Sequence, residues 1–257
     1  MTLRQEGAAP AFSASADDYA ATMAPSLRPV AREVVRRADL RPGERVVDLG
    51  TGTGIGAAAA LGDGRTVVGV DAAPGMLDVA RREIPGAEFV EADFGELPFA
   101  DAAFDVAIGV HALLFADDRV AALREWRRVT RVDGRLSLSV PGPNSRTALG
   151  MYRPIYDAYG IERGGEYPTV HDLAFWADVA GWTDVETAED PEMAIRLGDE
   201  ALFGRWLRVG CRGRATGDWP EERRAALARD MLAITPREPD GTLRIPFGAL
   251  YLAARAA

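Results

Sequence analysis

The amino-acid sequence predicts an α/β protein built around a largely parallel sheet. Between residues 45 and 140, short apolar runs alternate with amphipathic helical stretches, and this alternation implies right-handed crossovers between parallel strands. The runs are apolar on both faces, as a sheet covered by helices on two sides requires. A glycine-rich turn, Gly50, Gly52 and Gly54, directly follows the first run.

Composition narrows the classes of protein and partner. The 257 residues include 30 basic and 39 acidic side chains, one cysteine and two histidines. One cysteine excludes an internal disulfide and a cysteine-rich zinc site, and we expect no metal. The acidic balance argues against a nucleic-acid partner. No apolar run is long enough to span a membrane, so we expect a cytoplasmic protein with a small-molecule partner and no membrane partner.

The first half is the more regular. Residues 1–25 show little periodicity and are expected to be irregular, before a helix at 29–38. Five runs rich in apolar and β-branched residues predict strands. These strands are expected at 45–49, 66–70, 87–91, 104–110 and 135–140, with helices at 55–61, 75–83 and 119–129.

The second half mixes helical patterns with aromatic segments. Residues 144–168 hold too many tyrosines for a solvated linker, and we expect them to form a mobile cover over a binding site. Helical spacing predicts further helices, and two apolar runs predict strands. The helices are expected at 170–180, 199–209 and 220–234, and the strands at 184–187 and 244–252.

The glycine turn is the strongest functional signal. Alternating glycines after a strand allow a sharp turn and a close ligand approach, and the following helix offers free amide groups. The dinucleotide pattern G-x-G-x-x-G/A fails when counted from Gly50 but is met when counted from Gly52, so the spacing fits either a dinucleotide or S-adenosylmethionine. Asp48 favours S-adenosylmethionine, because a carboxylate there would repel the pyrophosphate of a dinucleotide and attract the ammonium group of S-adenosylmethionine.

Acidic residues at two further strand ends fit a bound nucleoside. Asp71 lies 21 residues after Gly50 and could accept hydrogen bonds from ribose hydroxyls. Asp93 could accept from an adenine amino group, or it could be a solvated loop residue. Met76 could cover the adenine, or it could belong to the core. A nicotinamide-dependent reductase is disfavoured by Asp48 and by the absence of lysine, which rules out a Tyr-x-x-x-Lys pair.

Four stretches together resemble the class I S-adenosylmethionine-dependent methyltransferases, in particular the small-molecule branch that includes quinone-biosynthesis and "type 11" enzymes. The stretches are VVDLGTGTG, VVGVDAAPGML, FVEADFGELPFADAAFDVAIG and ALREWRRVTRVDGRLSLSVPGP. Their order and spacing are specific together, and the resemblance covers roughly residues 12–142. Val132-Asp133-Gly134 departs mildly from the Pro-Gly-Gly turn usual in the family.

The resemblance implies a fold and a domain plan. The fold is a Rossmann-like, doubly wound sheet of seven strands in the order 3-2-1-4-5-7-6, with strand 7 antiparallel and helical cap elements. Residues 244–252 would be strand 7. The implied plan is an N-terminal helical cap segment at 1–40, a cofactor-binding core at 41–142, and a sheet completion at 143–257 with substrate-cap insertions at 144–168 and 196–235.

The resemblance also implies roles for matching residues. The glycine loop would hold the cofactor, with Asp48 near its amino group and Asp71 at the ribose. The other expected cofactor-binding residues are Tyr19 folded over the cofactor, Ala72, Met76, Asp93 and Phe94 at the nucleoside, and Val110 and His111 near the sulfonium.

The expected activity is methyl transfer from S-adenosylmethionine to O, C or N of a small apolar or aromatic acceptor, quinone-like or a secondary metabolite, with S-adenosylhomocysteine as product. His111 is the candidate catalytic base, because its unperturbed pKa of about 6.5 suits proton removal near neutrality. It could instead bond to the cofactor or backbone. The alternative activity is a non-methylating reaction such as cyclisation, and the expected assembly is a monomer or homodimer.

Bulky apolar side chains in the second half suggest an acceptor pocket. Plain helix packing is the alternative explanation for each of them. These candidate substrate-binding residues are Tyr152, Tyr156, Phe203, Trp206 and Trp219.

Overall fold

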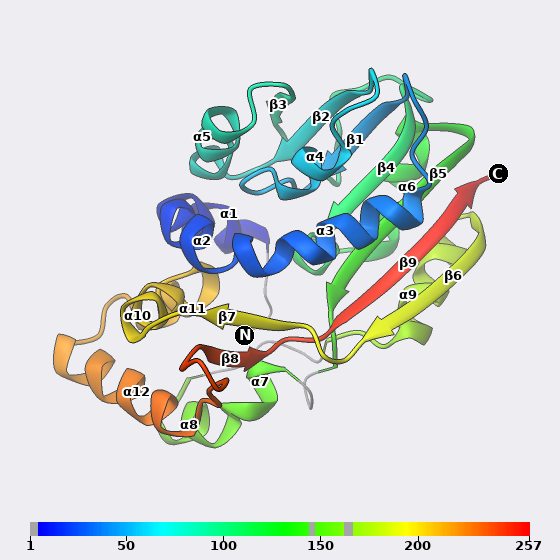
Figure 1. Cartoon of the computed structure of the whole chain (residues 1–257). Helices are drawn as coiled ribbons and strands as arrows, with labels where there is room; N and C mark the ends of the chain where they lie inside the picture. The colour runs from blue at the N-terminus through cyan, green and yellow to red at the C-terminus, as the bar shows by residue number, and fades with distance from the viewer. Residues whose placement is uncertain (1–4, 144–146, 162–166) are drawn as a thin grey trace.

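The computed structural model describes residues 5–143, 147–161 and 167–257, and its centre is a seven-stranded sheet. The strand order is β3-β2-β1-β4-β5-β9-β6 (Figure 1). The strands are β1 (Arg45–Leu49), β2 (Thr66–Asp71), β3 (Glu88–Glu91), β4 (Phe104–Val110), β5 (Thr130–Pro141), β6 (Trp182–Asp190) and β9 (Ala249–Ala256). The implied order is confirmed, since β9 is the seventh strand of this sheet and lies between β5 and β6.

Pairing within the sheet follows the expected directions. Strand β1 runs parallel to β2 and β4, β2 pairs in parallel with β3, and β4 with β5. Strand β9 is antiparallel to both β5 and β6. All five strands expected in the first half are present. Because all five run parallel to one another, their carboxyl ends meet at one edge of the sheet.

Helices cover both faces of the sheet and bury a core on each. One core joins α3 (Ala24–Ala38) and α4 (Ile55–Ala60) to side chains such as Val46 and Ile108. The other joins α6 (Arg119–Val129) and α9 (Val170–Val179) to Val47 and other residues of the opposite strand faces. Alternate residues of each strand therefore serve opposite layers, which explains why the strands are apolar throughout.

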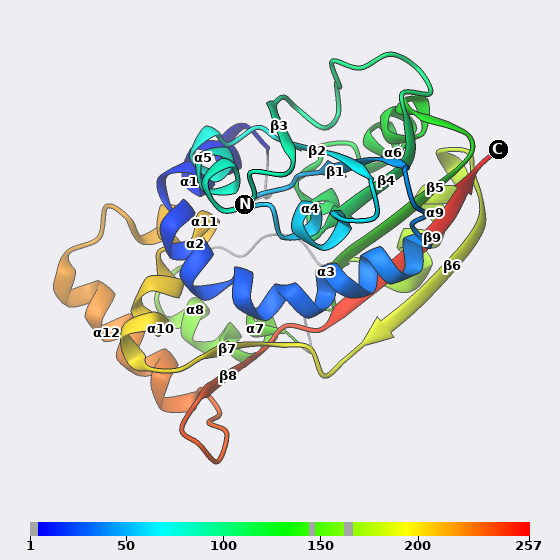
Figure 2. The same cartoon turned by 45° about the horizontal axis from the view of Figure 1, so that its top comes forward.

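The N-terminus corrects the expectation of an irregular segment. Helices α1 (Gln5–Ala14) and α2 (Ala16–Thr22) precede α3, and Figures 1 and 2 show them beside α5 (Pro74–Glu83). Their sequences are rich in alanine, which favours helix, but they carry no strong amphipathic pattern. Tertiary hydrogen bonds hold them instead, from Gly75 N to Ser13 Oγ at 2.8 Å and from Gly210 N to Ser15 Oγ at 3.0 Å.

The expected final strand is two strands in two different sheets, which is a second correction. Strand β8 (Leu243–Pro246) pairs with β7 (Ala194–Leu197) in a separate antiparallel sheet, and β9 begins three residues later. Gly248 has φ +57°, and both Phe247 N and Gly248 N donate to Met193 O. Because of this bend, residues 243–256 contribute one strand to the β7–β8 sheet and one strand to the seven-stranded sheet.

The cap lies beyond the carboxyl ends of the parallel strands (Figure 2). It comprises the β7–β8 sheet and short helices, several of which had no sequence signal. These helices are α7 (Ala148–Met151), α8 (Arg153–Ala158), α10 (Glu200–Leu207), α11 (Gly210–Thr216) and α12 (Glu221–Ile234). Among the described residues, no helix has the length and apolar character needed to cross a bilayer. The division into three segments and the mobility of 144–168, which lies partly outside the described residues, stay predictions.

Candidate functional site

The glycine loop between β1 and α4 forms a tight backbone cradle. Gly50 and Gly52 have φ of +67° and +55°, which disfavours residues with a Cβ. A Cβ on Gly50 would lie 2.4 Å from Ala112 Cβ, so the loop is packed against the end of β4. A Cβ on Gly52 would meet no described atom within 4 Å. Gly52 therefore borders open space, where a ligand could approach the backbone.

Asp48 braces this loop from inside the protein. Its side chain is fully buried, and Oδ2 accepts from Thr51 Oγ1 at 2.6 Å and from Ala57 N at 2.8 Å. Burial raises its pKa to about 6, although these two donors oppose the shift. Oδ1 has no hydrogen-bond partner among the described residues. One oxygen is thus committed to the loop, and the other could accept from a bound ammonium group.

Asp71 joins the end of β2 to the same loop. Its carboxylate accepts from Gly52 N at 2.8 Å and from Ala73 N at 2.9 Å. Burial raises the pKa of Asp71, and the backbone amides, including that of the half-buried Ala72, oppose the shift. Asp48 in β1 and Asp71 in β2 therefore both hydrogen-bond to the glycine loop.

Tyr19 and Met76 lie where the N-terminal helices meet α5. Met76 is buried in a small cluster with Ala16 and Val79, against which Phe12 and Tyr19 pack. The pKa of the Tyr19 hydroxyl is raised by burial and further by the negative charges of Asp71 and Asp48. The tyrosine is thus close to Asp71 and Asp48, while Met76 contacts helices α1 and α2.

The two predicted residues after β3, Asp93 and Phe94, have different surroundings. Asp93 is exposed, and its Oδ1 accepts from Gly95 N at 2.7 Å. Phe94 is buried edge-to-face against Trp126, whose Nε1 donates to Phe94 O at 3.0 Å. Asp93 thus caps a turn at the surface, and Phe94 anchors that turn to α6.

His111 follows β4 with an unusual backbone. Its φ is +57°, and it is 7% exposed, next to the buried Val110. Nδ1 lies 3.1 Å from Ser139 Oγ, whereas Nε2 has no hydrogen-bond partner among the described residues. Burial lowers the pKa to about 4. Burial therefore moves the pKa of His111 well below its unperturbed value of about 6.5, which favours the neutral imidazole at physiological pH.

Four of the five predicted acceptor residues form one aromatic cluster in the cap. Tyr152, Tyr156, Phe203 and Trp206 are buried, with ring centroids 5.4–6.0 Å apart along the chain of contacts. Trp219 lies apart, stacked on Tyr159 at 6.2 Å. The buried four are closely packed, so their side chains form the wall of the cap and leave little open surface of their own.

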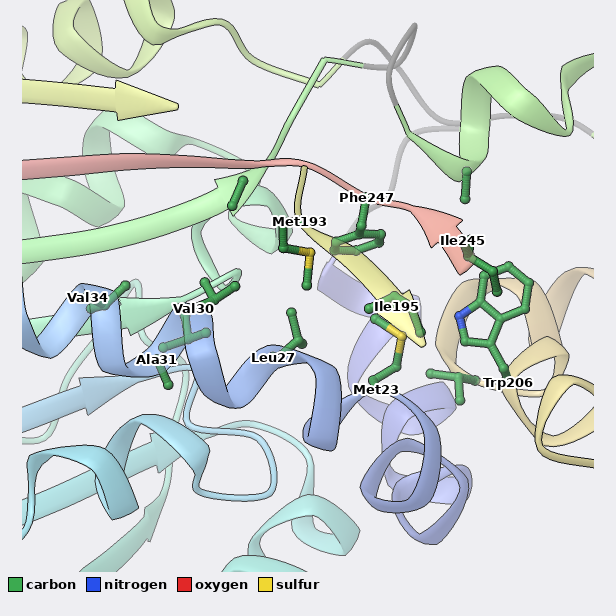
Figure 3. Packing of buried hydrophobic residues seen from close by; sticks show 14 of the residues in the cluster. Met23, Leu27, Val30, Ala31, Val34, Met193, Ile195, Trp206, Ile245 and Phe247 are labelled. Atoms are coloured by element: carbon green, nitrogen blue, oxygen red, sulfur yellow. The ribbon is translucent and has the colours of Figure 1, made fainter. Parts of the chain in front are cut away.

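Aliphatic and aromatic side chains complete the region between α3 and the cap. Figure 3 shows Met193 and Phe247 facing Leu27, and Ile195 beside Met23. All five belong to one buried cluster with the aromatic residues of the cap. Phe247 also lies 5.5 Å from the His111 ring, so this apolar region reaches the end of β4.

Comparison with known proteins identifies the family. The methyltransferase domain family matches residues 47–138. Demethylmenaquinone methyltransferase of Paenarthrobacter aurescens is 32% identical over 175 residues, covering 60% of this chain and 68% of that protein. The chain belongs to the class I S-adenosylmethionine-dependent methyltransferases. S-adenosylmethionine is the cofactor of this family.

Other relatives agree with this assignment. Malonyl-acyl-carrier-protein O-methyltransferase of Serratia marcescens is 34% identical over 149 residues, and the alignment spans 58% of each protein. Phosphoethanolamine N-methyltransferase 2 of Haemonchus contortus, solved with S-adenosylhomocysteine, has a TM-score of 0.58 at 16% identity, covering 88% of this chain and 52% of that one. The cyclase SpnF has a TM-score of 0.60 at 20% identity, covering 89% and 80%. At these identities the structural matches show the fold alone.

The site of this methyltransferase fits the cofactor on its own geometry. The backbone of Gly52 borders open space, one buried oxygen of Asp48 has no partner in the described part of the chain, and Asp71 lies at the neighbouring strand end. The contacts of these residues with the cofactor stay predictions.

Sequence reasoning missed two groups of residues around this site. Ser139 and Phe247 contact His111 from β5 and from the bend before β9. Asp18 of α2 binds Arg205 and Arg208 of the cap at 2.7 and 2.8 Å. The position of Ser139 near the carboxyl end of a strand was the one available signal, because the other contacts join segments over 100 residues apart.

Proposed function

We propose that this chain transfers the methyl group of S-adenosylmethionine to an oxygen, carbon or nitrogen of a small apolar or aromatic acceptor. The observation that carries the proposal is the continuous apolar cluster from Phe247, whose ring lies beside His111 after β4, to Trp206 in the cap. It includes Ala57 of α4, the helix that directly follows the glycine loop. An apolar acceptor would gain affinity there by leaving water.

The relatives' names support this acceptor class. A demethylmenaquinone methyltransferase is named for a quinone, and the second relative is named for a malonyl thioester on a carrier protein. The apolar lining of this chain favours the first type. The cytoplasmic setting and the monomeric or homodimeric state are part of the same proposal.

When bound, the cofactor supplies an activated methyl group on a sulfonium that leaves as a neutral thioether. The chain's own residues bind and align the reactants. The glycine loop and Asp71 hold the nucleoside, and Oδ1 of Asp48, which has no partner among the residues that the structure describes, accepts from the amino group. Helices α1 and α2, with Tyr19, exclude water from this edge of the sheet. Alignment of this kind can contribute about 7–11 kcal/mol to lowering a barrier.

The test is product analysis. We expect the chain with S-adenosylmethionine and a reduced naphthoquinone to yield S-adenosylhomocysteine and an acceptor heavier by one methylene unit, detected by mass spectrometry. A malonyl thioester serves as the second acceptor. Rearranged acceptor of unchanged mass, with no S-adenosylhomocysteine formed, would instead support a cyclisation.

A further inference from the structure

Helix α9 exposes two large apolar side chains. Phe175 and Val179 are 63% and 42% exposed and lie about one helical turn apart. The opposite face of the helix, with Leu173 and Ala177, is buried against the sheet. Among the described residues, four large apolar side chains are exposed, so half of them share this one turn. Adjoining exposed apolar residues, unlike scattered ones, indicate an interaction surface.

A groove extends this surface from α9 toward the edge strand β6. Its volume is about 540 Å³, and it is lined by Ala174, Phe175 and Asp178 of α9 and by residues 182–185 of β6. Phe175 therefore has open space on the β6 side of the helix. An apolar side chain of another molecule could lie in this groove against Phe175 and lose its contact with water.

Charges of opposite sign flank the apolar surface. On the α6 side, Arg124 is exposed, and its Nη2 donates to Val179 O at 3.3 Å. On the β6 side, Asp178 is exposed and lines the groove, as does Asp184. Neither Arg124 nor Asp178 has an ion-pair partner in the part of the chain that the structure describes. Because Arg124 contacts the residue after Asp178, the two charges lie at nearly the same height along α9, on opposite sides of the helix.

This pattern is self-complementary about a two-fold axis that runs parallel to α9, over Phe175 and Val179. Rotation about such an axis places α6 of one copy over β6 of the other and keeps the height along the helix. Arg124 of each copy then faces Asp178 of the other, and the exposed apolar side chains meet at the axis. An axis across the helix would instead oppose α6 to α6 and lose both ion pairs.

We propose that this chain forms a symmetric homodimer through the outward face of α9, with the two helices parallel and side by side across the two-fold axis. The face fits a second copy of the chain, because it carries both the positive and the negative charge that the opposing surface needs, at matching heights. The inference does not depend on which acceptor is methylated.

The free edge of β6 is a poor alternative contact between copies. Asp184 and Glu186 lie on this strand and are exposed, so pairing two β6 strands would bring carboxylates close together. The register of β6 with β9 also shifts between Thr183 and Glu186, and such a bulge makes an edge less regular for pairing. The helix face is therefore the better surface for dimerisation.

The first test is the dimerisation constant of the full chain, measured by analytical ultracentrifugation from about 1 to 100 μM. A small interface of this kind should have a Kd on the order of 10 μM. Phe175→Asp and Val179→Asp should each raise the Kd at least tenfold, because they place two carboxylates at the axis. Ile234→Asp is the matched control, since Ile234 of α12 is 47% exposed but lies in the cap, and it should leave the Kd unchanged.

The second test uses charge reversal to establish the orientation. Arg124→Glu and Asp178→Arg each bring like charges together twice in their own homodimer, so each should weaken dimerisation severalfold. A heterodimer of the two variants has one reversed pair and one native pair, both of opposite charge. A mixture of the two variants should therefore dimerise severalfold more tightly than either variant alone.

Three outcomes would overturn the inference. The first is a wild-type chain that stays monomeric up to about 100 μM, ten times the expected Kd. The second is dimerisation at the wild-type Kd in folded Phe175→Asp and Val179→Asp, which would place the contact on another face. The third is a mixture of the charge variants that dimerises no better than each alone, which would reject the two-fold arrangement. Circular dichroism shows whether each variant is folded.

Discussion

At the scale of single residues, the cofactor cradle depends on one glycine that faces open space. We predict that Gly52→Ala loses affinity for S-adenosylhomocysteine at least tenfold, because the new methyl group would occupy ligand space. A Cβ there meets no described atom within 4 Å, so the stability cost should be the backbone term of about 1–2 kcal/mol. Calorimetry and urea unfolding measure the two effects.

Gly43 offers a matched control. It also has a positive φ, +76°, and open space around its hypothetical Cβ, but it lies in the turn before β1, at the opposite end of that strand. Gly43→Ala should show a similar loss of stability and unchanged affinity. Equal losses of affinity in both variants would mean that Gly52 does not border the ligand.

Asp48 should make the cofactor-free protein less stable as pH rises. Its pKa is about 6 when folded and near 3.8 when unfolded, so its stabilising contribution is present below pH 3.8 and is lost as pH rises through 6. The loss is on the order of 3 kcal/mol. Asp48→Asn keeps an oxygen for Thr51 and Ala57 and should remove this dependence.

The measurement is the difference in unfolding free energy between wild type and Asp48→Asn from pH 4 to 8. Taking the difference cancels carboxylates with lowered pKa values, such as Asp18 and Asp105. The unfolding free energy of Asp48→Asn minus that of the wild type should increase across that pH range. A flat difference would show that Asp48 ionises in the fold as easily as in water.

At the scale of elements, the N-terminal helices connect the cofactor side of the site to the cap. Ser13 binds the start of α5, and Asp18 pairs with two arginines of the cap. Both pairs are partly exposed, so they add at most about 1 kcal/mol to global stability. Their effect should appear in local opening of α1 and α2.

We therefore predict that Asp18→Asn speeds dissociation of S-adenosylhomocysteine severalfold while unfolding free energy changes by less than about 1 kcal/mol. Stopped-flow displacement and amide exchange in α2 would detect the opening. Asp17→Asn is the control, because its carboxylate is 83% exposed and 3.7 Å from Arg82. Wild-type dissociation rates in both variants would contradict the role of Asp18 in keeping α2 closed over the site.

Elements with strong local signals were predicted well. Strands β1 and β4 and helix α6 have the expected limits, because apolar periodicity and an Asp118 cap define them locally. Helices α1 and α2 lack such a pattern and form by docking on α5 and α11. The break at Gly248 was missed, because the run through it is apolar on both sides and only the pairing of β8 with β7 separates it.

At the scale of the whole molecule, ligand binding should stabilise the native state in proportion to occupancy. At 100 times its Kd, S-adenosylhomocysteine should add about 2.7 kcal/mol, which raises Tm by roughly 5–10 °C in a protein of this size. NADH at equal concentration should leave Tm unchanged. A larger shift with NADH would contradict the predicted ligand class and the role given to Asp48.

The sequence by itself determined the central sheet, the glycine loop and the acidic residues at its edge, because each depends on neighbours within about twenty positions. Only the tertiary structure decided the closure of α1 and α2, the split of the last strand, and the surroundings of His111. Burial lowers the pKa of that histidine, and two of the residues that contact it, Ser139 and Phe247, lie 28 and 136 positions further along the chain. Desolvation is a property of packing between distant segments, so local sequence does not contain it.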